Sequence, residues 1–329
     1  MQLKNFFKEL FQTQDKVYQL AVRKIDKDGR LFFDREDYCF HIIGNESKLY
    51  WKADPFLFEY EGETYVFYEL YQYYIRRGVI AYSKLIDNDR ELKLTKPKVI
   101  IKENTHFSFP NVFRSGEDIF MIPETCEKNE VCLYKCVSFP DEWKKTETII
   151  TDIYTCDTLY LEDVELGGRY ILTSQMDKIP VEDRVPSCYV YNKMFRLNTS
   201  DWTITDKKGW DLQKGECGVR NGGLIRYKKA DKSMTIRVGQ NCKNGKYGRD
   251  FILYEILKIF PYREKQITHV SLEMLENHVR PKVELTGAHT YNATNKYEII
   301  DISMYQKLPF YVRAASVLHH CYSYLKNRM

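Results

Sequence analysis

The sequence predicts an all-β protein, a five-bladed β-propeller with short helices at its N- and C-terminal ends. Three observations lead to this fold class: alternating aromatic runs, a hairpin that recurs along the chain, and helical spacing only near the two ends. The chain contains 26 Tyr and 18 Phe, and runs such as "TYVFYELYQYY" and "RYILTS" have the alternation expected of half-buried strands. Most of the chain is therefore expected to be β-structure.

A hairpin that begins at Asp54 recurs along the chain. In "DPFLFEYEGETYVFYE" two apolar strands flank a glycine-bearing turn, and "FPNVFRSGEDIFMIPE" repeats this pattern from Phe109 with the same length. Further copies begin at Asp157 and Arg220, and a degenerate fifth copy runs from His289 to Asp301. The starts are separated by 55, 48, 63 and 69 residues, a spacing that suits a propeller of four-stranded blades.

The expected organisation is an N-terminal helix over residues 1–15, a propeller over residues 16–302, and a C-terminal amphipathic helix over residues 303–329. The stretch "LKNFFKELF" indicates the first helix. In the last helix one apolar stripe is formed by Ala314, Val317, Leu318, Cys321, Tyr322 and Leu325. This stripe, bordered by Arg313, Lys326 and Arg328, fits either packing on its own domain or peripheral contact with an anionic membrane surface.

The composition excludes several classes of protein. Fifty basic and forty-six acidic residues give a net charge of +4, which is too small and too evenly spread to indicate nucleic-acid binding. No long apolar run is present, and the N-terminal residues are too polar for a signal peptide. Nine cysteines, an odd number, fit free thiols in a reducing compartment. We expect a cytoplasmic protein, at the inner membrane face if the terminal helix contacts lipid.

The repeat starts form a group of candidate site residues. In a propeller the innermost strands surround the axis, so their equivalent positions converge at one end of it. Four of the five starts are polar: Asp54, Asp157, Arg220 and His289, with Phe109 as the exception. Burying such groups is costly without partners or a ligand, so they predict a ligand site. The other interpretation is that the aspartates cap turns or pair with arginines to tie the blades together.

Other motifs predict neither a cofactor nor a metal site. The cysteines of "CEKNEVCLYKC" have no histidine nearby and lie in a predicted strand, so ordinary buried thiols are expected. "GECGVRNGGL" lacks the strand and helix context of a dinucleotide site. "GQNCKNGKYG" contributes Gln240 and Asn241 to a polar wall of the axial site, or simply forms a hairpin turn at Asn244 and Gly245.

Taken together, these motifs resemble a known family. "ADPFLFEYEGETYVFYE", "FSFPNVFRSGEDIFMIPET", "CDTLYLEDVELGGRYILTS" and "VGQNCKNGKYG" resemble the five-bladed propeller at the N-terminus of plant glucosamine inositolphosphorylceramide transferases, whose bacterial relatives occur in surface-polysaccharide gene clusters. The resemblance extends over about residues 16–302. More distantly, the "ADP" hairpin is similar to the first blade of five-bladed arabinanase and xylosidase glycosidases, in which that aspartate is the general base.

The resemblance and the repeat together name the candidate residues. Candidate catalytic carboxylates are Asp54, Asp157 and Glu124. Candidate substrate-binding residues are Glu69, Asn111, Arg220, Arg237, Gln240, Asn241 and His289. The two arginines are expected to hold phosphate, because a guanidinium donates two parallel hydrogen bonds. The glycosidase pattern is incomplete, since Phe109 occupies the start of the second blade, where that group has a carboxylate.

Several functions remain open at this point. We expect a transferase of cell-surface glycoconjugate synthesis that acts on a sugar or activated sugar, with a glycan or lipid-linked acceptor. The resemblance by itself favours glycan binding, because the transferase fold of the plant relatives lies in a different domain. The alternatives are a glycan-binding propeller without catalysis, a glycosidase-like hydrolase, and a protein-interaction propeller. The transferase and binding interpretations differ in one structural respect: whether Asp54, Asp157 and Arg220 surround an open pocket or are paired with one another.

Overall fold

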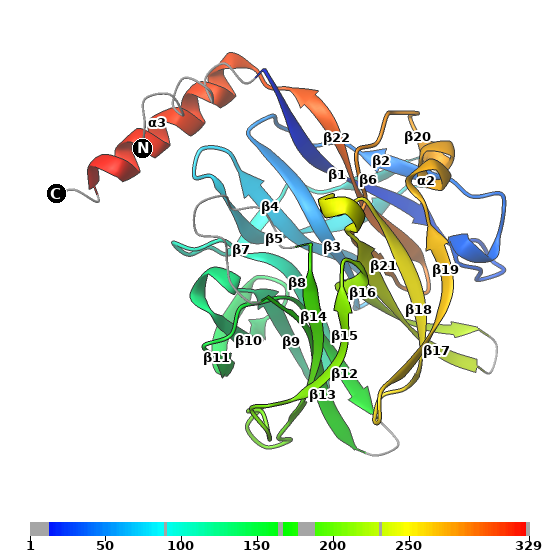
Figure 1. Cartoon of the computed structure of the whole chain (residues 1–329). Helices are drawn as coiled ribbons and strands as arrows, with labels where there is room; N and C mark the ends of the chain where they lie inside the picture. The colour runs from blue at the N-terminus through cyan, green and yellow to red at the C-terminus, as the bar shows by residue number, and fades with distance from the viewer. Residues whose placement is uncertain (1–12, 89–90, 164–166, 177–187, 230–231, 327–329) are drawn as a thin grey trace.

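Five sheets form the blades of a propeller in the computed structural model, and their strands pair antiparallel except for one short parallel pair at the outer edge of the fifth sheet (Figure 1). The structure describes residues 13–88, 91–163, 167–176, 188–229 and 232–326. The predicted fold class is confirmed, because each copy of the hairpin forms the two innermost strands of one blade.

The first two blades follow one another along the chain. Blade 1 comprises β3 (Tyr50–Tyr60), β4 (Glu63–Gln72), β5 (Arg77–Asp87), β6 (Leu92–Leu94) and β7 (Lys98–Ile101). Blade 2 comprises β8 (Ser108–Ser115), β9 (Asp118–Glu124), β10 (Glu130–Ser138) and β11 (Glu142–Thr151).

The next two blades have the same arrangement. Blade 3 comprises β12 (Thr155–Asp163), β13 (Gly168–Gln175), β14 (Val190–Leu197) and β15 (Trp210–Gly215). Blade 4 comprises β16 (Cys217–Lys229), β17 (Lys232–Asn241), β18 (Asp250–Lys258) and β19 (Arg263–Val270).

The fifth blade joins the two ends of the chain. Its strands, from the axis outward, are β21 (Tyr291–Ala293), β22 (Tyr297–Lys307), β1 (Gln14–Lys24), β2 (Phe40–Ile43) and β20 (Val279–Arg280). β1 pairs with β22 along its whole length, from Gln14 opposite Lys307 to Lys24 opposite Tyr297. This pairing closes the ring, because hydrogen bonds within blade 5 join a strand from the N-terminal end of the chain to one from the C-terminal end.

Local sequence explains why the inner hairpins form. In blade 1 a two-residue turn joins Tyr60 to Glu63, and both Glu61 and Gly62 have positive φ (49° and 83°), as a type I′ turn requires. Both faces of each inner strand are buried, because each blade packs between two neighbouring blades. One apolar cluster therefore contains Phe56 and Phe67 of blade 1, Phe109 of blade 2 and Leu159 of blade 3.

Helices are few in the described part of the chain. The short helix α2 (Leu272–His278) begins at Ser271, whose hydroxyl accepts a hydrogen bond from the Met274 backbone N–H. α3 (Phe310–Lys326) projects away from the blades (Figure 1). Three short 3-10 turns are also present, at Phe32–Asp34, Cys126–Lys128 and Lys243–Gly245.

The ends of the propeller differ from the expected limits. Most of the helix expected over residues 1–15 lies outside the described residues, and β1 already begins at Gln14. At the other end β22 continues to Lys307, past the expected limit at residue 302, because it pairs with β1 over that length. None of the helices in the described residues is both long and apolar enough to cross a bilayer.

Candidate functional site

The repeat starts share an unusual backbone conformation. Asp54, Phe109 and Asp157 have φ values of 52°, 46° and 52°, and each lies where the pairing of the two inner strands shifts register. Such a bulge turns a side chain out of the regular alternation, and the left-handed conformation is strained for these residue types. In blade 4 this place is taken by Gly218, with φ of 72°. Arg220, predicted as the start of the fourth repeat, therefore lies two residues beyond the equivalent position.

Carboxylates bond the bulges to the preceding blades. The Phe109 N–H donates to Asp54 Oδ2 at 3.3 Å, and the Asp157 N–H donates to Glu124 Oε2 at 3.3 Å. The Asp54 N–H donates in turn to Oδ2 of Asp301 at 3.0 Å, across the closure of the ring. The acidic residues at the axis therefore have a structural role, as the second interpretation of the sequence proposed.

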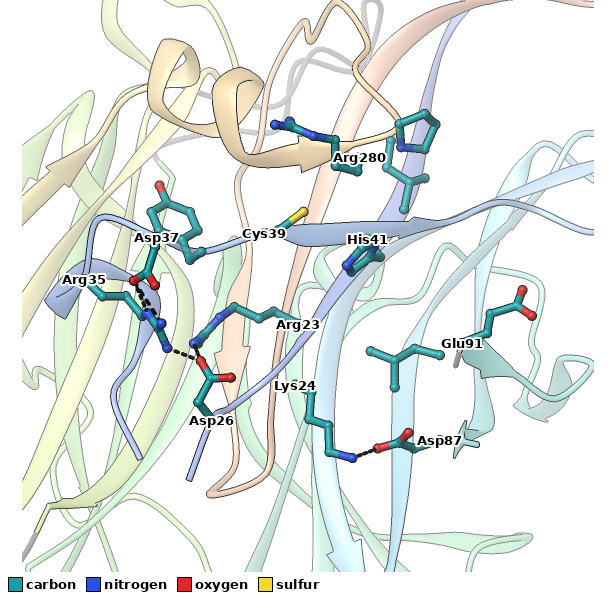
Figure 2. Close-up of a pocket in the computed structure, with 14 residues that line it drawn as sticks. Arg23, Lys24, Asp26, Arg35, Asp37, Cys39, His41, Asp87, Glu91 and Arg280 are labelled. Carbon is teal, nitrogen blue, oxygen red and sulfur yellow. Dashed lines mark hydrogen bonds and ion pairs between the residues drawn. The ribbon is translucent and has the colours of Figure 1, made fainter. Parts of the chain in front are cut away.

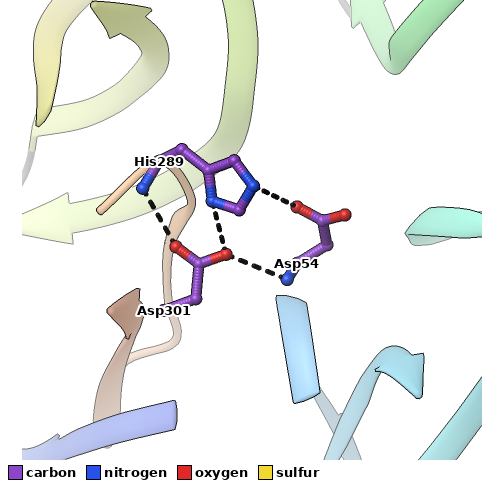
Figure 3. A group of neighbouring side chains, drawn as sticks. All are labelled: Asp54, His289 and Asp301. Carbon is purple, nitrogen blue, oxygen red and sulfur yellow. Dashed lines mark hydrogen bonds and ion pairs between the residues drawn. The ribbon is translucent and has the colours of Figure 1, made fainter. Parts of the chain in front are cut away.

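Asp54, His289 and Asp301 form a chain of ionisable groups (Figure 3). His289 Nδ1 lies 2.6 Å from Asp301 Oδ2, and its Nε2 lies 3.6 Å from Asp54 Oδ1. The Thr290 hydroxyl donates to Asp54 Oδ1 at 2.8 Å. The imidazole thus lies between two carboxylates, one of which, Asp301, is fully buried. The sequence analysis identified Asp54 and His289 but assigned no role to Asp301, although it ends the fifth repeat.

Burial and pairing shift the pKa values of Asp54 and Asp301 in opposite directions. Burial raises the pKa of Asp54 to about 6, against a lowering effect of the His289 imidazole. Burial also acts to raise the pKa of Asp301, but its contacts with His289 outweigh this and lower it. For His289, burial lowers the pKa and the Asp301 carboxylate raises it, with a net rise. Asp301 is therefore the carboxylate most strongly committed to the ion pair.

Asp157 and Arg220 pair directly. Arg220 Nε lies 2.5 Å from Asp157 Oδ2, and both side chains are at most 5% exposed. The guanidinium also lies over the Tyr247 ring, 4.8 Å from its centroid. Gln240 donates to Asp157 Oδ2 at 3.3 Å and to the Asn221 carbonyl at 2.7 Å. The charge of Arg220 is thus largely neutralised within the protein.

Two glutamates at the strand ends favour the protonated form. Burial, followed by the nearby Asp54 charge, raises the pKa of Glu69 well above its ordinary value. Burial and the Asp157 charge raise the pKa of Glu124 similarly, although Arg220 opposes this. Glu69 Oε1 also lies 3.3 Å from His106 Nε2. The axis therefore brings together carboxyl groups of contrasting ionisation, which is an arrangement suited to acid–base chemistry.

Three of the predicted residues, Arg237, Asn241 and Asn111, lie outside the axial group. Arg237 is fully buried against Glu264, with two nitrogens 2.7 and 2.8 Å from its carboxylate oxygens. Asn241 donates to Asp250 Oδ1 at 2.5 Å. Asn111 Oδ1 accepts the Tyr160 N–H of the next blade at 2.9 Å. These three side chains make local or cross-blade contacts of their own, whereas the remaining predicted residues come together at the axis.

Among the described residues, two groups of side chains bring potential metal-ligand atoms within 4.8 Å of one another. In Asp54, His289 and Asp301, different ring nitrogens face the two carboxylates, so one ion could take only one nitrogen of the histidine. In the second group, Glu124 and Asp157 lie beside Cys156, whose pKa burial raises well above its usual range. Asp157 is already paired with Arg220. Both groups therefore fit internal pairing better than coordination of an ion.

A cavity of about 790 Å³ lies away from the axis, between the outer strands of blades 5 and 1 (Figure 2). Charges of both signs line it, and several of them pair: Arg35 bonds to Asp26 and Asp37, and Lys24 lies 2.5 Å from Asp87. The four arginine and lysine residues of its lining are thus matched in number by four carboxylates.

Comparison with solved structures supports the fold. The chain superposes on the α-L-arabinofuranosidase of Podospora anserina with a TM-score of 0.55 and 10% identity, over 82% of this chain and 98% of that one. A thermostable family-43 glycoside hydrolase gives a TM-score of 0.51 at 10% identity, over 78% and 89% of the two chains. At this identity the likeness shows a shared propeller fold and nothing about activity.

Sequence comparison identifies the family. Curated relatives include glucosamine inositolphosphorylceramide transferase 1 of Arabidopsis thaliana, 29% identical over 217 residues, and that of Oryza sativa subsp. indica, 25% identical over 215 residues. Both matches cover 65% of this chain but only 27% of the relative, so the chain spans about a quarter of those proteins. The family model for the N-terminal part of this transferase matches residues 39–298. The chain therefore belongs to the glucosamine inositolphosphorylceramide transferase 1 N-terminal domain family.

Proposed function

We propose that this protein is a carbohydrate-active transferase of glycoconjugate or cell-surface polysaccharide synthesis, with its reaction centre at the polar end of the propeller axis. The observation that carries the proposal is the contrast among the axial carboxyls. Asp54, with a pKa of about 6, is ionised at neutral pH, whereas Glu69 and Glu124 are shifted toward the protonated form. A site that holds a base beside carboxyl groups of raised pKa is suited to moving protons in both directions.

In this proposal Asp54 is the general base. It would accept the proton of an acceptor hydroxyl as that oxygen forms a bond to the anomeric carbon of the sugar donor. The leaving group would depart with the electrons of the broken bond to the anomeric carbon, and Glu124 would be the acid that protonates it. His289 would position Asp54, since Asp301 holds the other side of the imidazole.

The family supports the choice of substrate class. The curated relatives are named for transfer to inositolphosphorylceramide, so an activated sugar donor and a phosphate-bearing lipid acceptor are the substrates to test first. Because the chain covers only about a quarter of those relatives, their activity is transferred here as a proposal. The glycosidase alternative has weaker support, since Phe109 occupies the place of a second-blade carboxylate.

A specific observation favours a second function, glycan binding without catalysis. Asp157 and Arg220 are paired with each other, which leaves Asp157 less available as a catalytic group. Buried carboxylates can also recognise sugar hydroxyls without any proton transfer. In that case the propeller would position a glycan for a separate enzyme.

One experiment tests both functions. The purified protein is incubated with nucleotide sugars and with inositol phosphate lipids, and products and thermal stabilisation are measured in parallel. The transferase proposal predicts product with the wild type and loss of turnover with Asp54→Asn. The control variant is Asp118→Asn, which removes an exposed carboxylate on β9. Sugar-dependent stabilisation without product in either protein would instead support the binding function, and the absence of both would contradict the axial site.

We also propose that α3 contacts the inner membrane face. Val312 and Val317 are buried, but Phe310, Tyr311 and Leu318 are 65%, 56% and 69% exposed. Exposed apolar side chains on a projecting helix are suited to a lipid surface. Co-sedimentation with anionic vesicles tests this, and binding that is unchanged in Phe310→Ser with Leu318→Ser would contradict it.

A further inference from the structure

The arginines that the sequence assigned to phosphate are both neutralised in the structure. Arg220 pairs with Asp157, and Arg237 pairs with Glu264. A phosphate group would have to displace a buried carboxylate from either one, at a considerable electrostatic cost. The inner strands present two other arginines, Arg114 on β8 and Arg226 on β16, and these line a separate cavity.

This cavity lies at the other end of the axis. The polar site lies at the starts of the inner strands, whereas the lining of the cavity comes from the ends of β3, β8 and β16 and from the turn that follows β21. The cavity has a volume of about 580 Å³, which is within the range of small-molecule sites. We refer to it as the basic mouth, defined by Arg114, Arg226 and Asn111.

The two guanidinium groups are positioned by contacts that leave their charges available. Arg114 lies over the rings of Phe58 and Tyr60, 5.2 and 5.5 Å from their centroids. Arg226 donates to the Tyr160 carbonyl at 3.2 Å. Within the described ranges of the chain, neither guanidinium forms an ion pair with a carboxylate. Aromatic faces and a carbonyl orient an arginine without neutralising it.

Asn111 adds a buried donor beside them. Its Oδ1 accepts the Tyr160 N–H, and this bond fixes which way the amide points. Because Tyr160 also accepts the Arg226 hydrogen bond at its carbonyl, Asn111 and Arg226 are brought to the same part of blade 3. Asn111 lines the cavity and is only 4% exposed, so its Nδ2 is a pre-positioned donor.

The other charged groups of the basic mouth leave a net positive charge. Lys296 donates to Glu59 Oε2 at 3.0 Å, so these two charges offset each other. Glu61 is the remaining carboxylate in the lining, and it is exposed at the hairpin turn. A ligand bound near Arg114 and Arg226 would therefore meet two cations. They are opposed by the solvated Glu61 and by Glu162, whose charge acts on Arg226 from outside the lining and which also lies 3.8 Å from Arg169.

We infer that the basic mouth is a binding site for a phosphate group carried by a sugar or an inositol. Two guanidinium forks and an amide donor match the several oxygens and the double charge of a phosphate monoester. Aromatic rings beside the guanidinium groups provide apolar surface for the carbohydrate that carries the phosphate. The site is separate from the polar end, and its existence does not depend on catalysis there.

Isothermal titration with glucose 1-phosphate and myo-inositol 1-phosphate tests the inference. The wild type should bind with a saturable signal, and Arg114→Gln and Arg226→Gln should each weaken binding about tenfold or more, as expected when a charge-assisted hydrogen bond is lost. The matched control is Arg169→Gln, because Arg169 also lies over an aromatic ring, Trp202, but outside the cavity. Circular dichroism checks that each variant is folded.

The outcomes separate this site from the proposed function. Asp54→Asn should bind the sugar phosphates as the wild type does, even if it loses all turnover. Equal affinity of the wild type and both arginine variants, or the absence of saturable binding, would overturn the inference. Co-sedimentation with vesicles that contain phosphatidylinositol distinguishes a lipid-borne phosphate from a soluble one. Sedimentation that is lost in Arg114→Gln and Arg226→Gln identifies a lipid headgroup. Binding of the free sugar phosphates without sedimentation identifies a soluble ligand. Either result supports a phosphate site at this mouth.

Discussion

The two ends of the propeller axis differ in how their charges are balanced. At the polar end Asp157 pairs with Arg220, and Asp54 and Asp301 flank His289, all with little exposure. At the basic mouth Arg114 and Arg226 are held by aromatic rings and a carbonyl group. The inner strands β3, β8 and β16 supply residues to both ends. Whether a charged side chain pairs within the protein or remains available to a ligand therefore depends on which end of the inner strand it occupies.

This difference has a physical cause. At the polar end a strained bulge brings backbone N–H groups and carboxylates of adjacent blades together, so the charges bond to one another. At the basic mouth the strands diverge into hairpin turns, and the side chains of blades 2 and 4 face a cavity. We therefore expect mutations at the polar end to lower stability in addition to any effect on turnover, and mutations at the basic mouth to affect binding with little loss of stability.

The largest expected effect is that of Asp157→Asn. It leaves the Arg220 charge buried without its closest partner, and removing one member of a buried pair costs about 3–5 kcal/mol. Urea unfolding at neutral pH measures this cost. Asp118→Asn is the control, because its pair with Lys135 is about half exposed and should cost less than about 1 kcal/mol. Equal small losses in both variants would remove the proposed contrast between the ends.

A pH dependence of stability is expected from Asp54. Its pKa rises from 3.8 to about 6 in the folded protein, so the folded state favours the neutral carboxyl. Its contribution to stability is therefore complete below about pH 4 and is lost as the pH rises through 6. The free energy of unfolding of the wild type, minus that of Asp54→Asn, should fall by roughly 2–3 kcal/mol over this range. Parallel pH profiles of the two proteins would show that Asp54 ionises normally.

The double variant Arg114→Gln with Arg226→Gln should be nearly as stable as the wild type. Its main loss is the stacking of Arg114 on Phe58 and Tyr60, worth about 0.5–1 kcal/mol. Urea unfolding under the conditions used for Asp157→Asn allows a direct comparison. A loss as large as that of Asp157→Asn would mean that these arginines are structural as well.

Raising the salt concentration should weaken phosphate binding at the basic mouth more than it changes the stability contributed by the polar end. At 1 M chloride the Debye length falls to about 3 Å, so phosphate binding at the solvated basic mouth should weaken severalfold. The stability cost of Asp157→Asn should change by only a few tenths of a kcal/mol, because buried pairs are screened much less. Titration and unfolding in low and high salt measure the two quantities. Salt-independent phosphate binding would contradict an open cationic site.

Much of the fold could be predicted because its signals are local. Alternating aromatic residues and the two-residue turn at Glu61 and Gly62 predicted the inner hairpins, and their recurrence predicted five blades. The pairing of β1 with β22 could not be predicted in the same way. It joins residues nearly 300 positions apart in the chain, and neither strand carries a local mark of its partner.

The candidate site was predicted in part for the same reason. Asp54, Asp157, Arg220 and His289 were found from their place in the repeat, and the structure brings them together. Asp301 was not predicted, because its role depends on contacts with Asp54 of blade 1 and with His289, which form only in the folded protein. Arg114 and Arg226 could not be predicted from the repeat starts, because they lie toward the opposite ends of the same inner strands.

The sequence by itself determined the strand periodicity, the number of blades and the family, because these depend on residues that are near one another in the chain. Only the tertiary structure decided which charges pair. Arg220 was neutralised by Asp157, and Arg237 by Glu264, once the strands had assembled into sheets. Electrostatic energy depends on distance in space and on exclusion of water, and both are set when separate blades meet around the axis.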